Sequence, residues 1–200
     1  MPDHTPGLKA YVDRYKAVCD VLPYGDISRM VDLLWEACRT GRRIFTMGNG
    51  GHGNTASHMI NDIAKHTVSS DDKTKVVADA NRFKTMCLND SMSFVTGIAN
   101  DMGFEQVFAE QLANWVEPGD VVIGISASGN SENVLRAVRY ANEHGGVTIG
   151  LCGFKGGKLR ELAQTAIYVR NEHYGHVEDA HCVVCHCLAY WFLETLKQEG

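Results

Sequence analysis

The stretch Ser126-Ala-Ser-Gly-Asn-Ser131 directly follows the apolar run Asp-Val-Val-Ile-Gly-Ile at 120–125. A stretch of the same kind, Gly48-Asn-Gly-Gly-His-Gly53, follows the apolar run Arg-Ile-Phe-Thr-Met at 43–47. Each predicts a buried strand, a tight turn and the start of a helix. Glycine lets the backbone of such a turn approach a ligand closely, and the helix start presents unpaired amides to an anion. Two such turns indicate a binding site for a phosphate-bearing small molecule.

Strand and helix patterns alternate along the rest of the chain. Apolar runs predict strands at 43–47, 83–88, 120–125, 147–152 and 166–169. Apolar residues at helical spacing predict helices at 8–21, 27–40, 54–65, 91–99, 104–115, 131–144, 158–163 and 177–197. Polar residues predict a loop at 68–81 and a turn at 100–103. This alternation favours an α/β fold, a parallel sheet covered by helices on both faces. The two helices before the first strand either cover the sheet or pair with another subunit.

Composition narrows the class of protein. The 200 residues suggest one domain, and 44% hydrophobic residues are enough for a substantial core. The net charge of −5, without a basic stripe, argues against nucleic acid as a partner. Because no apolar run approaches the roughly 20 residues of a membrane span, and the N-terminus lacks a signal-peptide pattern, we expect a cytoplasmic protein without a membrane partner. The seven cysteines are then free thiols.

The serine-rich turn has a plain structural interpretation and a functional one. An ordinary helix start would use Ser131 as the N-cap and Gly129 for an unusual backbone angle. That explanation leaves Ser126 and Ser128 without a role. Because hydroxyl groups donate hydrogen bonds to an anion without adding charge, we expect the three serines to bind a phosphate.

Two predicted helices carry acidic and imidazole side chains. His58 and Asp62 lie four positions apart on one face, and His186 lies eight positions after Glu178, on nearly the same face. His181 points about 140° away from His186 around the helix. If the two helices meet, His58, Asp62, Glu178 and His186 form a cluster that holds a divalent metal or moves protons. The alternative is that they are exposed polar residues at helix ends or at a subunit interface.

Other polar residues have simpler interpretations. The tract His181-Cys-Val-Val-Cys-His-Cys187 looks like a metal site, but Cys182 and Cys185 have no second cysteine pair elsewhere. We interpret the tract as a packed helix face. Asp90 and Asp101 each follow an asparagine in a turn, where aspartate is more often a cap than a catalytic acid.

The glycine turn at 48–51, the serine turn at 126–131 and Asn100-Asp-Met-Gly-Phe104 together resemble the sugar-isomerase (SIS) domain family, in particular its phosphoheptose isomerases. The resemblance covers nearly the whole chain and implies a single SIS domain at 1–200, with a flavodoxin-like, doubly wound parallel sheet of about five strands. It implies a homotetramer, assembled through the helical segment 1–41, with active sites between subunits. The implied reaction converts sedoheptulose 7-phosphate to D-glycero-D-manno-heptose 7-phosphate, an aldose–ketose isomerisation through an enediol.

The resemblance also implies roles for individual residues. Phosphate binding falls to Ser126, Ser128 and Ser131, and the rest of the substrate lies near Asn49, Gly50, Gly51 and Asp90. Asp62 and His186 are the catalytic base and acid, reaching the substrate from opposite sides. Zinc is implied as a cofactor, held by His58, Asp62, Glu178 and His186.

The chain departs from the family pattern at two of these positions and at His52. Asp62 stands where the family has glutamate, so its carboxylate lies about 1 Å further back, and Glu178 replaces a glutamine. His52 stands where serine is common. Two anionic ligands favour a divalent metal, but an aspartate bound to zinc is a poor base, so the two roles of Asp62 compete.

A second interpretation is a non-catalytic SIS module, either a sugar-phosphate-sensing regulator or a tetrameric scaffold. The acid and imidazole pair favours an enzyme, because a scaffold has no need of it. We expect no DNA-binding segment in this sequence, which counts against a regulator. A metal-dependent epimerase is a further alternative.

Overall fold

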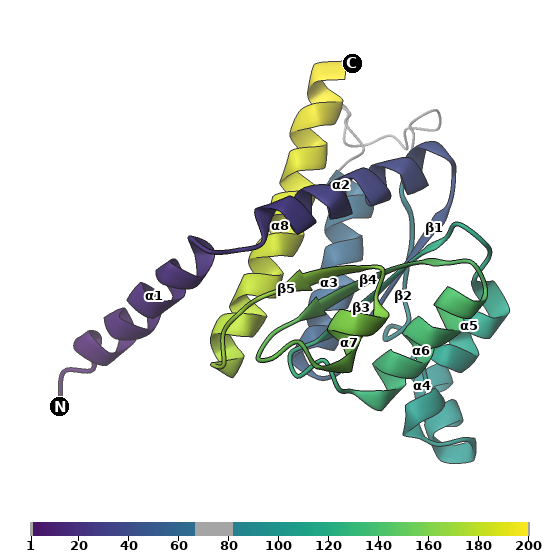
Figure 1. Cartoon of the computed structure of the whole chain (residues 1–200), viewed down its shortest axis with the longest axis horizontal. Coiled ribbons are helices and arrows are strands. Elements are labelled where there is room, and N and C mark those ends of the chain that lie inside the picture. The colour runs from purple at the N-terminus through teal and green to yellow at the C-terminus, as the bar shows by residue number, and fades with distance from the viewer. Residues whose placement is uncertain (1, 67–81, 200) are drawn as a thin grey trace.

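A five-stranded parallel sheet forms the centre of the computed structural model, which describes residues 2–66 and 82–199 (Figure 1). The strands are β1 (Arg43–Gly48), β2 (Lys84–Cys87), β3 (Val121–Ser126), β4 (Val147–Cys152) and β5 (Thr165–Tyr168). Their order is β2-β1-β3-β4-β5, and every neighbouring pair is parallel. This is the doubly wound order expected of a flavodoxin-like sheet. The loop predicted at 68–81 lies outside the described residues.

Helices connect and cover the strands. They are α1 (Thr5–Cys19), α2 (Tyr24–Arg39), α3 (Gly51–His66), α4 (Met92–Asp101), α5 (Ala109–Trp115), α6 (Glu132–Glu143), α7 (Gly157–Leu162) and α8 (Tyr174–Glu199), with a 3₁₀ turn η1 (Phe104–Gln106). Three predictions were wrong in detail: α3 begins at Gly51 rather than 54, α4 continues into the turn predicted at 100–103, and the helix predicted at 104–115 is divided. The consecutive residues Val107 and Phe108 are both buried at that division, so packing overrides the helical pattern there.

Side chains alternate between the two faces of the sheet, and each face has its own hydrophobic core. On β3, Val121, Ile123 and Ile125 pack toward α2, α3 and α8. Val122, between them in sequence, packs toward α5, α6 and α7. This period of two in buried strands explains why the sheet carries helices on both sides.

The helices α3 and α8 run side by side in the same direction (Figure 1). The hydroxyl of Thr55 on α3 lies 3.4 Å from the sulfur of Cys182 on α8, 127 positions later in the chain. Gly51 and Glu178, also 127 positions apart, are in contact one helical turn earlier. The sequence predicted the acid and imidazole group only on the condition that these two helices meet. The structure shows that they do.

The first helix projects from the rest of the fold (Figure 1). Of its side chains only Val18 is buried, whereas Leu8 and Val12 are exposed. The Tyr11 hydroxyl donates a hydrogen bond to Asp179 at the start of α8, 2.5 Å away. In the described part of the chain, no helix has the length and apolar character needed to cross a membrane.

Candidate functional site

The serine turn lies at the carboxyl edge of the sheet, between β3 and α6. Ser126 is the buried last residue of β3, and its hydroxyl lies 3.0 Å from the hydroxyl of Ser131. Ser128 is exposed, and its hydroxyl oxygen accepts a hydrogen bond from the Asn130 amide. An open pocket of about 510 Å³ borders this turn, lined by Ser128, Asn130, Phe154, Lys155, Gly157 and Glu172. The turn therefore combines hydroxyl groups with room for a ligand.

The helix-cap explanation of Ser131 is not supported by its contacts. Ser131 stands at the N-cap position of α6, but its side chain makes no capping hydrogen bond and faces Ser126 instead. Gly129 does have the expected positive φ, +64°. It is also crowded, because a Cβ at this position would lie 1.9 Å from the carbonyl oxygen of Gly156. The hydroxyl of Ser131 is thus available for a role other than capping.

Replacing Ser131 with alanine separates the two explanations. A capping serine would cost about 0.5–2 kcal/mol on substitution. Because Ser131 makes no cap bond, we expect Ser131→Ala to change the free energy of unfolding by less than about 0.5 kcal/mol. We expect its affinity for inorganic phosphate to fall roughly tenfold, since hydrogen bonds to a charged group are strong. Thermal unfolding with and without phosphate measures both the stability and the phosphate affinity, with Ser93→Ala on α4 as a matched control. A lower melting temperature with unchanged phosphate affinity would contradict the prediction.

The first glycine turn lies beside the serine turn, because β1 and β3 are neighbours. Gly50 is exposed at φ +55°, and no atom lies within 4 Å of the position a Cβ would take, so the backbone is open to a ligand there. The side-chain amides of Asn49 and Asn133 exchange two hydrogen bonds of 2.9 and 2.8 Å, which tie this turn to α6. Each amide keeps one further N–H for a ligand. The contact of Asn49 with a sugar stays a prediction.

Asn89, which the sequence analysis treated only as part of a turn, holds the same turn from the other side. Its side chain accepts a hydrogen bond from the Gly48 amide at 3.1 Å and donates one to the Gly48 carbonyl at 2.8 Å. Its neighbour Asp90 is exposed. Ligand-binding groups commonly lie at the carboxyl ends of parallel strands. The position of Asn89 just after β2 was therefore the signal that could have identified it as a site residue.

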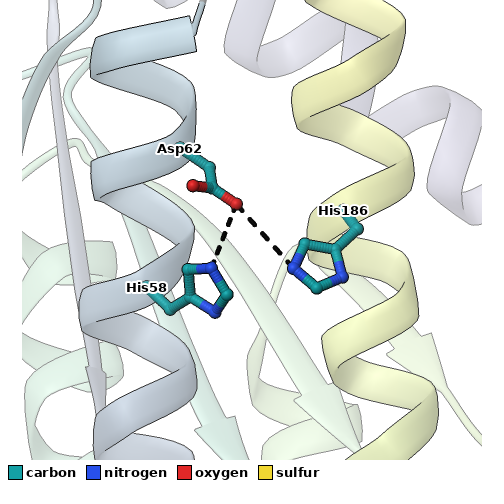
Figure 2. A group of neighbouring side chains, drawn as sticks. All are labelled: His58, Asp62 and His186. Atoms are coloured by element: carbon teal, nitrogen blue, oxygen red, sulfur yellow. Dashed lines mark ion pairs between the residues drawn. The ribbon is translucent and has the colours of Figure 1, made fainter.

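The predicted acid and imidazole group forms between α3 and α8, with three of its four members. Figure 2 shows His58, Asp62 and His186 facing one another across the two helices. Oδ2 of Asp62 lies 3.2 Å from Nε2 of His58 and 3.8 Å from Nε2 of His186. The Asp62 side chain is 8% exposed, and the two imidazoles are about half exposed. A nearly buried carboxylate with two accessible imidazoles is able to accept protons or to bind a cation.

Glu178 does not join this group within one chain. The helical angle between Glu178 and His186 is small, but eight residues separate them by about 12 Å along α8. Glu178 instead lies at the first glycine turn, where its carboxylate contacts Gly51. The expected approach of Asp62 and His186 from opposite sides is also absent within one chain, because the two side chains are adjacent.

The three residues fit a zinc ion. Their ligand atoms all lie within 4.8 Å of one another. In a tetrahedral zinc site with bonds of about 2.0–2.1 Å, neighbouring ligand atoms are separated by roughly 3.3 Å, close to the distances above. Three protein ligands with a free fourth position are typical of catalytic rather than structural zinc. Among the described side chains the cysteines of 181–187 take part in no such group.

A second imidazole pair lies between α3 and α8, and the sequence analysis did not predict it. Nε2 of His52 lies 3.0 Å from Nδ1 of His181, and both rings are buried. Burial lowers the pKa of His52 to about 4 and that of His181 to about 3, so both imidazoles are neutral at pH 7. His181 thus points away from His186, as its helical angle predicted.

The turns and the acid and imidazole group lie far apart within one chain. Asp62 follows Gly51 by eleven positions, about 16 Å along α3. The first glycine turn and the acid and imidazole group therefore lie at different positions along α3.

Comparison with known proteins identifies the family of the chain. The chain belongs to the SIS domain family, whose model matches residues 10–153. Curated relatives are phosphoheptose isomerases: that of Geotalea daltonii is 34% identical, with coverage of 81% of this chain and 80% of the relative. That of Nitratiruptor sp. is 38% identical, with coverage of 76% and 77%.

Solved structures support the fold across nearly the whole length. The phosphoheptose isomerase of Neisseria gonorrhoeae superposes with a TM-score of 0.82 at 25% identity, covering 94% of this chain and 96% of its own. That of Francisella tularensis gives a TM-score of 0.84 at 22% identity, with coverage of 96% and 100%. The α/β SIS fold expected from the sequence is confirmed.

Proposed function

We propose that this protein is a sugar-phosphate aldose–ketose isomerase that interconverts sedoheptulose 7-phosphate and D-glycero-D-manno-heptose 7-phosphate. The observation that carries the proposal is the Asp62 carboxylate between two imidazoles, in a chain that also holds a serine turn suited to phosphate. Relatives at 34% and 38% identity over most of the chain are named for this activity. A scaffold or regulator would have no use for a base.

In the proposed reaction the phosphate is bound by Ser126, Ser128 and Ser131, and the sugar extends past the first glycine turn. Asp62 takes the proton from C1 of the ketose, which gives the enediol, and returns it to C2. His186 gives a proton to O2 and takes the proton from O1, so the product is an isomer with the same atoms. Because Asp62 and His186 are adjacent, we expect them to act from the same side, with one base serving both carbons.

The proposal includes a homotetramer with active sites between subunits, in the cytoplasm. Two observations support shared sites: the roughly 16 Å along α3 between Gly51 and Asp62, and the exposed apolar residues of the projecting α1. A neighbouring copy would bring its Asp62 and His186 to the phosphate held by this chain.

Zinc belongs to the proposal as a cofactor held by His58, Asp62 and His186. When bound, it would polarise the carbonyl or hydroxyl oxygen of the substrate. A carboxylate has two oxygens, and here Oδ2 of Asp62 faces the imidazoles while Oδ1 accepts a hydrogen bond from Asn61 at 3.3 Å.

The test is turnover of sedoheptulose 7-phosphate, followed by proton NMR in D₂O, with enzyme as purified, with chelator and with added zinc. We expect the aldose to form with deuterium at C2, and activity to fall on chelation and return with zinc. Exchange without zinc dependence would contradict the zinc cofactor and still support the isomerase activity. A protein that gives neither turnover nor exchange, yet melts at a higher temperature with the sugar phosphate, would be a binding module.

A further inference from the structure

An open pocket of about 490 Å³ lies at the β5 edge of the sheet, and the proposed reaction makes no use of it. It is lined by Ala166, Tyr168 and Arg170, which are two positions apart and therefore share one face of the strand. The helix α7 contributes Arg160, and the chain around the start of α2 supplies the rest of the lining. No lining residue is shared with the pocket at the serine turn, so the two pockets are separate.

The ring of Tyr168 holds the two guanidinium groups of this pocket. Their central carbons lie 4.3 Å (Arg160) and 5.9 Å (Arg170) from the centre of the ring, within the range of a cation–π interaction. The ring itself is fixed, because its hydroxyl donates a hydrogen bond of 2.7 Å to the carbonyl of Phe154. The stem of Arg160 packs against Gly156, where a Cβ would lie 2.5 Å from the Cδ of the arginine. Both cations are therefore held at the pocket.

The two guanidinium groups have unused donors. In the parts of the chain that the structure describes, no carboxylate forms an ion pair with Arg160 or Arg170, although Asp26 lines the same pocket. By contrast, Arg136 on α6 is paired with Glu132 at 3.2 Å. A planar guanidinium matches the oxygens of a phosphate with two parallel hydrogen bonds. The pair is therefore suited to an anion from outside the chain.

The start of α2 adds a further attraction for an anion. Pro23 stands at the N-cap position and lines the pocket. Because proline has no side-chain acceptor, this helix start has no side-chain cap, and its first amides carry the positive end of the helix dipole. Asp26 in the same turn opposes an anion, which leaves two positive charges against one negative in the lining. Such a lining attracts a doubly charged anion more strongly than a singly charged one.

The remaining lining is apolar. Val21, Pro23 and Ala166 all face the pocket, and Val21 is 71% exposed. An inorganic ion would leave these side chains uncovered, whereas the organic part of a larger ligand would cover them. No imidazole and only one carboxylate line the pocket, so its groups suit binding and not proton transfer.

We propose that this pocket binds a small phosphate monoester at a site separate from the serine turn. Arg160 and Arg170 hold the phosphate, and the apolar side chains contact the organic part. The site goes beyond the proposed function, because it requires neither turnover nor zinc.

Calorimetric titration with phenylphosphonate, a stable analogue of a phosphate monoester with an apolar ring, tests the proposal. The serine turn is expected to take the same probe, so every titration is repeated in a Ser131→Ala background. We expect Arg160→Gln and Arg170→Gln each to weaken binding roughly tenfold or more in that background, as the loss of hydrogen bonds to a charged group implies. Methylphosphonate, which lacks the ring, should bind more weakly than phenylphosphonate. Unchanged affinity in both arginine variants would overturn the proposal.

Two matched variants separate this site from a general effect of charge. Arg42→Gln removes the same charge from an exposed arginine before β1, at the amino ends of the strands, and should change the affinity by less than about twofold. Asp26→Asn removes the opposing carboxylate and should strengthen binding by about two- to fivefold. Equal losses in Arg42→Gln and Arg160→Gln would show attraction by net charge alone and would contradict a built site.

The Ser131→Ala background also decides which turn holds the probe. Binding that survives Ser131→Ala and is lost in the arginine variants supports the second site. Binding that is lost in Ser131→Ala alone would mean that the probe occupies only the serine turn, and would overturn it. If Arg160→Gln does not fold because its stem packs against Gly156, Arg170→Gln carries the same test.

Discussion

Replacing Asp62 with asparagine should lower kcat by about 10²- to 10⁴-fold, the usual contribution of a general base. Asparagine keeps the shape of the side chain but has no basic oxygen between His58 and His186. The fold should be retained, because asparagine has nearly the same size as the buried aspartate and leaves its neighbours in place. Initial rates of isomerisation and of deuterium exchange measure the effect.

Two further variants complete this experiment. Asp62→Glu restores the length common in the family and should stay within about tenfold of the original kcat, since the group remains a base. Asp13→Asn, on an exposed ion pair of α1, makes the matched change away from the site and should leave kcat unchanged. Full activity of the Asp62→Asn variant would show that Asp62 is not the catalytic base.

Replacing Gly129 with alanine should be the most destabilising single change at the site. The left-handed conformation at φ +64° costs an alanine about 1–2 kcal/mol. Its Cβ would also meet the Gly156 carbonyl at 1.9 Å, and such overpacking adds about 1–3 kcal/mol. At about 2–4 °C per kcal/mol for a chain of this size, the melting temperature should fall by roughly 4–20 °C.

The same variant should lose phosphate protection, because the loop at Gly156 and the serine turn would have to separate. Gly97→Ala on α4 is the control, since no atom lies within 4 Å of that Cβ and alanine favours a helix by about 0.5–1 kcal/mol. Thermal unfolding of both variants, with and without phosphate, measures these effects. An unchanged melting temperature for Gly129→Ala would mean that the two loops are not packed in solution as described.

Local patterns in the sequence were sufficient for the elements and for the serine turn. The strand, the turn glycine and the helix start around 120–131 are consecutive, so no knowledge of distant contacts was needed. The helical spacing of His58 and Asp62 likewise placed them correctly on one face. The sheet order followed from the resemblance to the SIS family rather than from periodicity.

Predictions that depended on how far along a helix a residue lies were less successful. Helical angles gave Glu178 and His186 a common face, but the rise along α8 separates them by about 12 Å. The partner of His52 depends on α3 and α8 running in the same direction with a fixed offset, which no local pattern contains. The role of Asn89 depended likewise on the adjacency of β1 and β2.

The two outermost strands of the sheet are short. β2 and β5 have four residues each, against six in β1, β3 and β4. Short edges leave few unpaired backbone groups, so they are poor templates for the addition of a strand from another molecule. This limits edge-to-edge aggregation during folding and in the cell. In the proposed tetramer, contacts between copies of the chain would then fall to helices, whose side chains, rather than backbone hydrogen bonds, would select the partner.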